Sequence, residues 1–212
     1  MVSQREAFAE AARSAAGLIA LPAVAAAWSK PSALAEFSVS GLTGHLAAQV
    51  LNVPLALSAD VAGEQPISLL DHYGSVQWIE AGVDAEINVG IREGGERIAL
   101  VGPQALAQQV SDTASDLRER LAQLPADHVV RLPWTGWCLR LDDFLVTRMM
   151  EIAVHSDDLA VSVGIATPDL PPHVLDPVLA LLTSLAAGRH GQPAVLRALS
   201  RAERAPVSIT AF

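Results

Sequence analysis

Hydrophobic side chains recur at helical spacing over most of the 212-residue chain. The clearest run follows Pro103, where apolar residues occupy positions 106, 110, 117, 121 and 124. Such steps place side chains on one face of an α-helix, so a helix is predicted to begin at Pro103. A second long helix is predicted over residues 143–163, with Asp142 or Asp143 as its N-cap and Gly164 at its end.

The N-terminal part of the chain is also predicted to be helical. Residues 4–28 are alanine-rich, and Pro22 is expected to kink or break that helix. The next helix is predicted to begin near Ser38 or Ser40, because either hydroxyl can cap it, and to bend or end at Pro54.

The remaining segments give weaker patterns. Short helices are predicted over residues 67–80 and 83–97, and further helices over residues 171–187 and 193–199. The last residues, 206–212, are expected to form a single terminal strand. Residues 127–141 have strand character as well. Pro133 and Gly136 interrupt them, so an extended connection is favoured over a strand.

The sum of these elements is a mainly α protein. Four long helices, with a crossover of roughly forty residues between the second and third, are typical of a four-helix bundle. We expect residues 1–165 to form the bundle and residues 166–212 to form a C-terminal helical extension packed on it.

Composition and charge exclude several classes of partner. Hydrophobic residues make up 51% of the chain, which is enough for a large core. The formal net charge is −9 and no basic cluster is present, which argues against nucleic acid and anionic membranes as partners. The apolar run over residues 15–28 lacks the basic lead of a signal peptide and is too short to span a membrane. The first predicted helix is apolar on most of its sides, which makes a homodimer plausible.

The single cysteine, Cys138, excludes an intrachain disulfide and a cysteine-based metal cage. Its neighbours Trp137 and Leu139 favour a buried, inert thiol over a nucleophile. A chain with one unpaired cysteine fits a reducing compartment, so a cytoplasmic location is expected.

The predicted helix over residues 143–163 carries a polar stripe in an otherwise apolar sequence. Glu151 and His155 are four residues apart and therefore share one face. His45 lies on the core-facing side of the second helix. If these three side chains meet, two imidazoles and one carboxylate suit a divalent metal, most simply zinc, with a fourth position open for water or substrate.

Arg148 and Asp158 extend the same stripe and are the candidate catalytic residues. Arg148 is expected to pack over Glu151, with a structural ion pair as the alternative. Asp158 follows His155 by three residues and can orient that imidazole as a hydrogen-bond acceptor.

Simpler interpretations stay open from the residues alone. A histidine on an apolar helix face is more often hydrogen-bonded in the core than bound to metal. The three residues then form a buried hydrogen-bonded triad in a helical interaction domain. His72 is another possible ligand, although a hydrogen-bonded helix residue is favoured there. Three further histidines are expected to face solvent: His128, His173 and His190.

Two stretches bear a resemblance to a known family. WSKPSALAEFSVSGLTGHLA and RMMEIAVHSDDLAVSVG resemble the two signatures of the mycothiol-dependent maleylpyruvate isomerase N-terminal domain family, whose members are DinB-like metal-binding four-helix bundles. The resemblance implies that His45, Glu151 and His155 fall on the family's metal ligands. It also implies a low-molecular-weight thiol, mycothiol or a similar one, as cosubstrate.

The function implied is that of a metal-dependent enzyme which activates such a thiol. The thiol would be transferred to a small electrophile, or would assist the electrophile's isomerisation. The alternative is a non-catalytic metal or small-ligand binding protein built on the same bundle.

Overall fold

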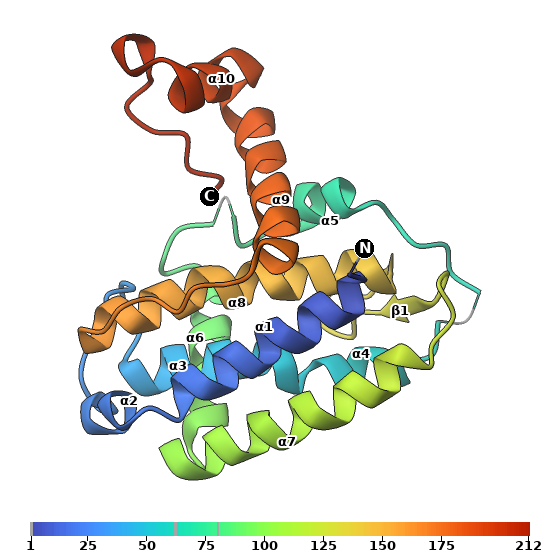
Figure 1. Ribbon diagram of the computed structural model, residues 1–212, viewed down its shortest axis with the longest axis vertical. Coiled ribbons are helices and arrows are strands. Elements are labelled where there is room, and N and C mark those ends of the chain that lie inside the picture. Colours follow the sequence, from blue (N-terminus) through green and yellow to red (C-terminus); the bar gives the residue numbers. More distant parts are fainter. Residues whose placement is uncertain (1, 62, 80) are drawn as a thin grey trace.

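The chain folds into a mainly helical molecule around a four-helix bundle (Figure 1). The computed structural model describes residues 2–61, 63–79 and 81–212. The bundle helices are α1 (Gln4–Ile19), α3 (Val39–Leu51), α7 (Pro103–Ala122) and α8 (Leu141–Val163). Helix α1 packs on α7 and α8, and α3 packs on α8. Large side chains from all four helices are fully buried between them, among them Phe8, Leu42, Leu117 and Phe144. The predicted fold class is therefore confirmed.

Local sequence signals set the starts of the first helices. Ser3 and Glu6 form a reciprocal capping box at the start of α1. Ser38 caps α3 by accepting a hydrogen bond from the backbone N–H of Gly41, so the predicted start of this helix is confirmed. The predicted break near Pro22 is also confirmed. Helix α1 ends at Ile19, and a short separate helix, α2 (Pro22–Ala27), begins at Pro22.

The crossover between α3 and α7 is helical and packed. It contains α4 (Val53–Ser58), α5 (Leu69–Ser75) and α6 (Glu86–Ala99). The helices predicted over residues 67–80 and 83–97 are thus present with shifted bounds, although position 80 itself lies outside the described residues.

Helix α6 lies unusually close to α3. A Cβ atom added to Gly44 would lie only 2.0 Å from the carbonyl oxygen of Gly95, and one added to Gly95 would lie 2.3 Å from the carbonyl oxygen of Gly41. Gly44 and Gly95 therefore both require glycine. This contact holds the crossover against the helix that carries His45.

A small β-hairpin precedes α8. Strands β1 (Val129–Arg131) and β2 (Cys138–Arg140) pair antiparallel. The prediction of an unpaired extended connection over residues 127–141 was wrong. Pro133 and Gly136 lie in the turn between the strands, where they do not interrupt the ladder.

The predicted cap of α8 was also wrong. Arg140 stands at the N-cap position, and its side chain makes no capping hydrogen bond. Asp142 and Asp143 lie inside the first turn, where negative charge is favourable beside the helix N-terminus. The predicted end at Gly164 is confirmed, because this glycine adopts the left-handed conformation with φ of 71°.

The C-terminal part projects from the bundle in Figure 1. It consists of α9 (Pro172–His190), which packs on α8 and α1, then α10 (Gln192–Ser200) and a 3-10 turn at Ala202–Arg204. The terminal strand predicted over residues 206–212 does not form. Instead the tail returns to the crossover, where Phe212 packs against Tyr73 and Trp78. The division into a bundle and an extension at residue 165 stays a prediction.

No helix within the described ranges combines the length and the apolar character that crossing a membrane requires.

Candidate metal centre

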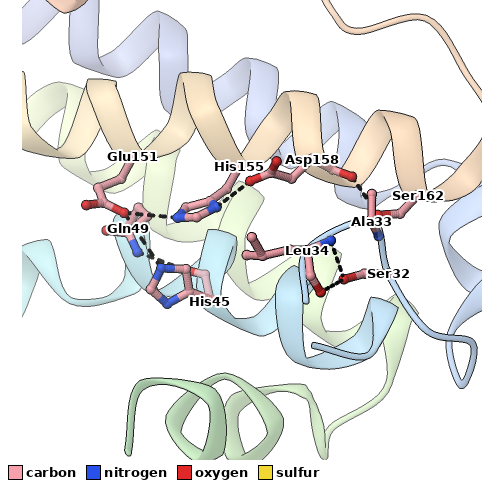
Figure 2. Close-up of polar contacts among 9 residues, drawn as sticks. All are labelled: Ser32, Ala33, Leu34, His45, Gln49, Glu151, His155, Asp158 and Ser162. Atoms are coloured by element: carbon pink, nitrogen blue, oxygen red, sulfur yellow. Dashed lines mark hydrogen bonds and ion pairs between the residues drawn. The ribbon is translucent and has the colours of Figure 1, made fainter. Parts of the chain in front are cut away.

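Helices α3 and α8 bring three potential metal ligands together (Figure 2). His45 on α3 faces Glu151 and His155 on α8. Oε2 of Glu151 lies 3.1 Å from Nε2 of His155 and 3.6 Å from Nε2 of His45. The two imidazole rings are nearly perpendicular, with centroids 4.6 Å apart. One ligand atom from each residue lies within 4.8 Å of the other two.

The three side chains are shielded from solvent without being sealed. The exposed fractions of the side chains are 18% for His45, 13% for Glu151 and 14% for His155. The ring of Phe37, in the loop before α3, lies 5.9 Å from the ring of His45. Two imidazole nitrogens and a carboxylate in a partly apolar environment are a donor set that suits zinc.

Asp158 lies beside His155, on the ring nitrogen that points away from Glu151. Its Oδ2 atom is 2.9 Å from Nδ1 of His155 (Figure 2). An ionised carboxylate can only accept a hydrogen bond, so Nδ1 carries the proton in this pair. A neutral His155 therefore has its lone pair on Nε2, the atom that faces Glu151 and His45.

The loop before α3 is tied to this same face of α8. The backbone N–H of Ala33 donates to Oγ of Ser162, at 2.8 Å. The Ser162 hydroxyl in turn donates to the carbonyl oxygen of Asp158. These bonds connect the loop directly to the turn of α8 that carries Asp158.

The electrostatics of the cluster favour separated charges. Burial by itself raises the pKa of Glu151, but its bonds with His155 and His45 lower that pKa well below its usual value. Burial lowers the pKa of His155, yet hydrogen bonds with Asp158 and Glu151 outweigh it and raise the pKa to about 9. Burial is the largest effect on His45 and lowers its pKa. The metal-free cluster thus holds an ionised carboxylate and a protonated imidazole, and a cation can take the place of that proton.

The packing of Arg148 over Glu151 stays a prediction, whereas the hydrogen bonds of its guanidinium are defined. Among the described residues it forms no ion pair with Glu151. Its Nη1 atom donates to Oε1 of Gln49, and its Nε atom donates to Oγ1 of Thr147. The guanidinium also lies over the ring of Phe144, 5.4 Å from its centre.

Gln49 is a residue that the sequence reasoning did not single out. It is 3% exposed, and its Nε2 atom donates to the carbonyl oxygen of His45 at 2.9 Å. Its Oε1 atom accepts from Arg148, so this amide connects the two helices beside the metal centre. The available signal was a polar residue one turn after His45 on an apolar helix face.

His72 does not join the three ligands. Its Nδ1 atom accepts a hydrogen bond from Nε1–H of Trp137, at 3.0 Å. Burial lowers the pKa of His72 to about 4, so this imidazole is neutral near neutral pH. The interpretation as a hydrogen-bonded helix residue is confirmed.

The remaining candidates also lie apart from the centre. His190 is exposed, whereas His128 and His173 are half-buried, and Nε2 of His173 lies 2.6 Å from Glu10. Cys138 is buried, and burial raises the pKa of its thiol, as expected for an inert cysteine.

A large groove in the described part of the chain lies elsewhere. It has a volume of about 1490 Å³ and runs between α1 and α7. None of the three potential metal ligands lines it. The volume of a groove therefore does not identify the candidate metal centre. The chemistry of its three potential ligands does.

Two comparisons with known proteins show what this chain is similar to. The family model for the mycothiol maleylpyruvate isomerase N-terminal domain matches residues 8–160, which include all three potential ligands. The crystal structure of the mycothiol-dependent maleylpyruvate isomerase is similar in fold, with a TM-score of 0.55 and 16% sequence identity. The match covers 88% of this chain and 72% of that one. A comparison with curated protein sequences gives no match.

Proposed function

The chain belongs to the mycothiol maleylpyruvate isomerase N-terminal domain family, and from this premise we propose that it is a metal-dependent enzyme acting on a low-molecular-weight thiol. The thiol, mycothiol or a similar one, is transferred to a small electrophile or assists its isomerisation. The observation that carries this proposal is the approach of His45, Glu151 and His155 to within 4.8 Å of one another.

The residues present fit zinc. Both imidazoles can offer Nε2, and Glu151 offers a carboxylate oxygen, which leaves one position of a tetrahedral site open. A closed structural site would use four protein ligands, so a set of three supports a site that binds a reactant. When bound, zinc lowers the pKa of a coordinated thiol, so that the thiolate persists near neutral pH.

The chain's own residues hold that arrangement in place. Asp158 keeps the proton of His155 on Nδ1 and thereby keeps the Nε2 lone pair directed at the site. Glu151 stays ionised and offsets one of the two positive charges of the cation. Gln49 fixes the backbone of His45 and the guanidinium of Arg148 through one amide.

The chemistry then follows from thiolate reactivity. The sulfur adds to a carbon–carbon double bond conjugated with a carbonyl group, so a C–S bond forms and the electron pair of the double bond moves onto the carbonyl oxygen as an enolate. The former double bond is then single and can rotate. Elimination of the thiolate breaks the C–S bond and returns the isomerised double bond. In a transfer reaction, the sulfur instead displaces a leaving group, which departs with its electron pair, or the anion formed by addition takes a proton from water and the thioether adduct is the product.

The test combines metal content with turnover. Purified protein is expected to bind one zinc ion per chain and to conjugate mycothiol to the fluorogenic electrophile monochlorobimane. His45→Ala is expected to lose both properties, whereas His190→Ala, at an exposed histidine, retains them. Both variants are expected to stay folded.

Each other result has a definite meaning. Zinc below about a tenth of an equivalent, with a melting temperature unchanged by added zinc, would end the metal proposal. Stoichiometric zinc without turnover of any mycothiol conjugate would identify a metal-binding protein without this activity.

A further inference from the structure

The loop before α3, residues 31–38, closes on itself. Its two ends pair as an isolated antiparallel bridge. Within it, the backbone N–H of Phe37 donates to the carbonyl oxygen of Leu34, which defines a four-residue turn, and the Ser32 hydroxyl donates to the same oxygen. The loop is therefore a compact element with hydrogen bonds of its own.

This loop shields the two histidines of the metal centre. The ring of Phe37 lies 5.9 Å from the ring of His45. Figure 2 shows the side chain of Leu34 directed from the loop toward His45 and His155. Both hydrophobic side chains are partly buried and pack against the core, whereas Glu36 is exposed. The loop thus presents its apolar side to the imidazoles and its other side to solvent.

A hydroxyl group on α8 holds the loop in this position. The backbone N–H of Ala33 donates to Oγ of Ser162 at 2.8 Å, and that hydroxyl donates to the carbonyl oxygen of Asp158 at 2.5 Å. Among the described residues, the bond from Ala33 is the one hydrogen bond that joins the loop to α8, and it lies at the surface. Water can replace a single exposed bond at little cost, so the loop can leave α8 without disrupting the bundle.

The conformation of Glu36 is a second, independent observation. Glu36 is the third residue of the turn, and its φ of 63° is the one positive φ of a non-glycine residue in the described part of the chain. This left-handed conformation is unfavourable for a glutamate, whereas Gly and Asn adopt it more readily. Strain of this kind is typical of segments that clamp a ligand or switch between two conformations. The turn therefore holds Phe37 against His45 at an energetic cost that unwinding of the turn would release.

We propose that residues 31–38 form a flap, which covers the histidine side of the metal centre and opens to admit the metal and the thiol. In the closed state the apolar side chains of the flap exclude water from the imidazoles. Opening breaks the bond between Ala33 and Ser162 and relaxes the turn at Glu36. The inference rests on the proposed function for the identity of what enters, but the flap itself is a property of the metal-free chain.

The experiment measures access to His45 in the metal-free protein. Diethyl pyrocarbonate modifies accessible imidazole nitrogens, and mass spectrometry of peptides gives the rate at each histidine. Ser162→Ala removes the acceptor of the bond from Ala33, so it is expected to speed modification of His45 by about 3- to 10-fold. Ser162→Thr keeps a hydroxyl group and is expected to react at the wild-type rate.

A second pair of variants acts on the turn in the opposite direction. Glu36→Asn favours the left-handed conformation and is expected to slow modification of His45 by about 2-fold or more. Glu36→Gln removes the same charge without that preference and is expected to react at the wild-type rate. A purely structural disturbance of the loop would not give a faster rate at one position and a slower rate at the other.

Two other histidines serve as internal controls. His190 is exposed, and its rate is expected to be equal in all variants. His72 is 4% exposed and bonded to Trp137, so its rate is expected to stay low throughout. Equal His45 rates in the wild type and Ser162→Ala would overturn the inference. A rate that rises by the same factor at His45 and His72 would also overturn it, because general unfolding would then expose both.

Zinc exchange separates the flap from the proposed function. A flap that controls only access changes the association and dissociation rates by the same factor, so Ser162→Ala is expected to speed both by about 3- to 10-fold with unchanged affinity. A weaker zinc affinity together with an unchanged His45 rate would overturn the flap and assign Ser162 a positioning role through Asp158. Opposite effects of Ser162→Ala and Glu36→Asn on His45 in a protein that binds no zinc would retain the flap and end the metal proposal.

Discussion

Two buried regions of the molecule use histidine in opposite ways. At the metal centre, Nδ1 of His155 is held by the carboxylate of Asp158. In the aromatic cluster formed by His72, Tyr73 and Trp137, Nδ1 of His72 is held by an indole N–H. The first partner accepts a hydrogen bond, and the second donates one.

This difference determines what each imidazole can do. Asp158 and Glu151 raise the pKa of His155 to about 9, whereas burial lowers the pKa of His72 to about 4. In the neutral state His155 has its lone pair on Nε2, which faces the site, while the lone pair of His72 is already used by Trp137. Burial of an imidazole therefore does not by itself indicate a metal ligand. The hydrogen-bond partner of the ring nitrogen that does not face the metal indicates it.

The largest effect on zinc binding is expected from removing one histidine from each of the two regions. His155→Ala is expected to reduce zinc affinity by more than about 100-fold, beyond the range found when only an outer partner is lost. His72→Phe is expected to leave zinc affinity unchanged. Competition with a chromogenic chelator measures both, and circular dichroism checks that both variants are folded.

That prediction fails in either of two ways. Zinc retained at full stoichiometry in His155→Ala would remove this residue from the ligand set. Zinc lost in His72→Phe would place the aromatic cluster in contact with the metal.

Acid is expected to affect the two regions in opposite directions. The pKa of His72 is about 4 in the folded protein, so its imidazole binds a proton more weakly in the folded state than in the unfolded chain. This contribution to stability is complete above the unfolded pKa of about 6.5 and is lost as the pH falls toward 4. The raised pKa of His155 acts the other way, and its contribution in the metal-free protein is lost as the pH rises through about 9.

Urea unfolding of the metal-free protein at pH 7 and pH 4.5 measures the effect of His72. The wild type is expected to lose about 2–3 kcal/mol more than His72→Gln over this interval. Equal losses in the two proteins would mean that His72 is solvated in the folded state. His190→Gln, at an exposed histidine, is the control.

The same contrast shows which parts of the fold the sequence could predict. Helices with a clear period and a good terminal residue were predicted correctly, as at Ser38 and Gly164. The hairpin before α8 was missed, because each strand is only three residues long and its stability comes from pairing, which no local pattern records. The tail over residues 206–212 has the composition of a strand, but it packs through Phe212 instead of pairing.

For the metal centre, the spacing of residues along the chain predicted proximity only within a single helix. Glu151 and His155 share a face of α8 by periodicity, so their proximity was predictable. The approach of His45 from α3 required the resemblance to a family. The bond between Arg148 and Gln49 joins residues 99 positions apart, and only the packing of α3 on α8 decides that these two side chains meet.

The gentlest test changes the partners and leaves both histidines in place. Asp158→Asn is expected to weaken zinc binding by about 10-fold, because an amide oxygen still accepts from Nδ1 of His155 but carries no charge. Trp137→Phe is expected to leave zinc affinity unchanged and to lower the free energy of unfolding by about 1 kcal/mol through the lost bond to His72. Chelator competition and urea unfolding, applied to both variants, give the four values needed. If Asp158→Asn instead changed only stability, the carboxylate would have a packing role alone, and the two histidine environments would differ in proton affinity without differing in metal binding.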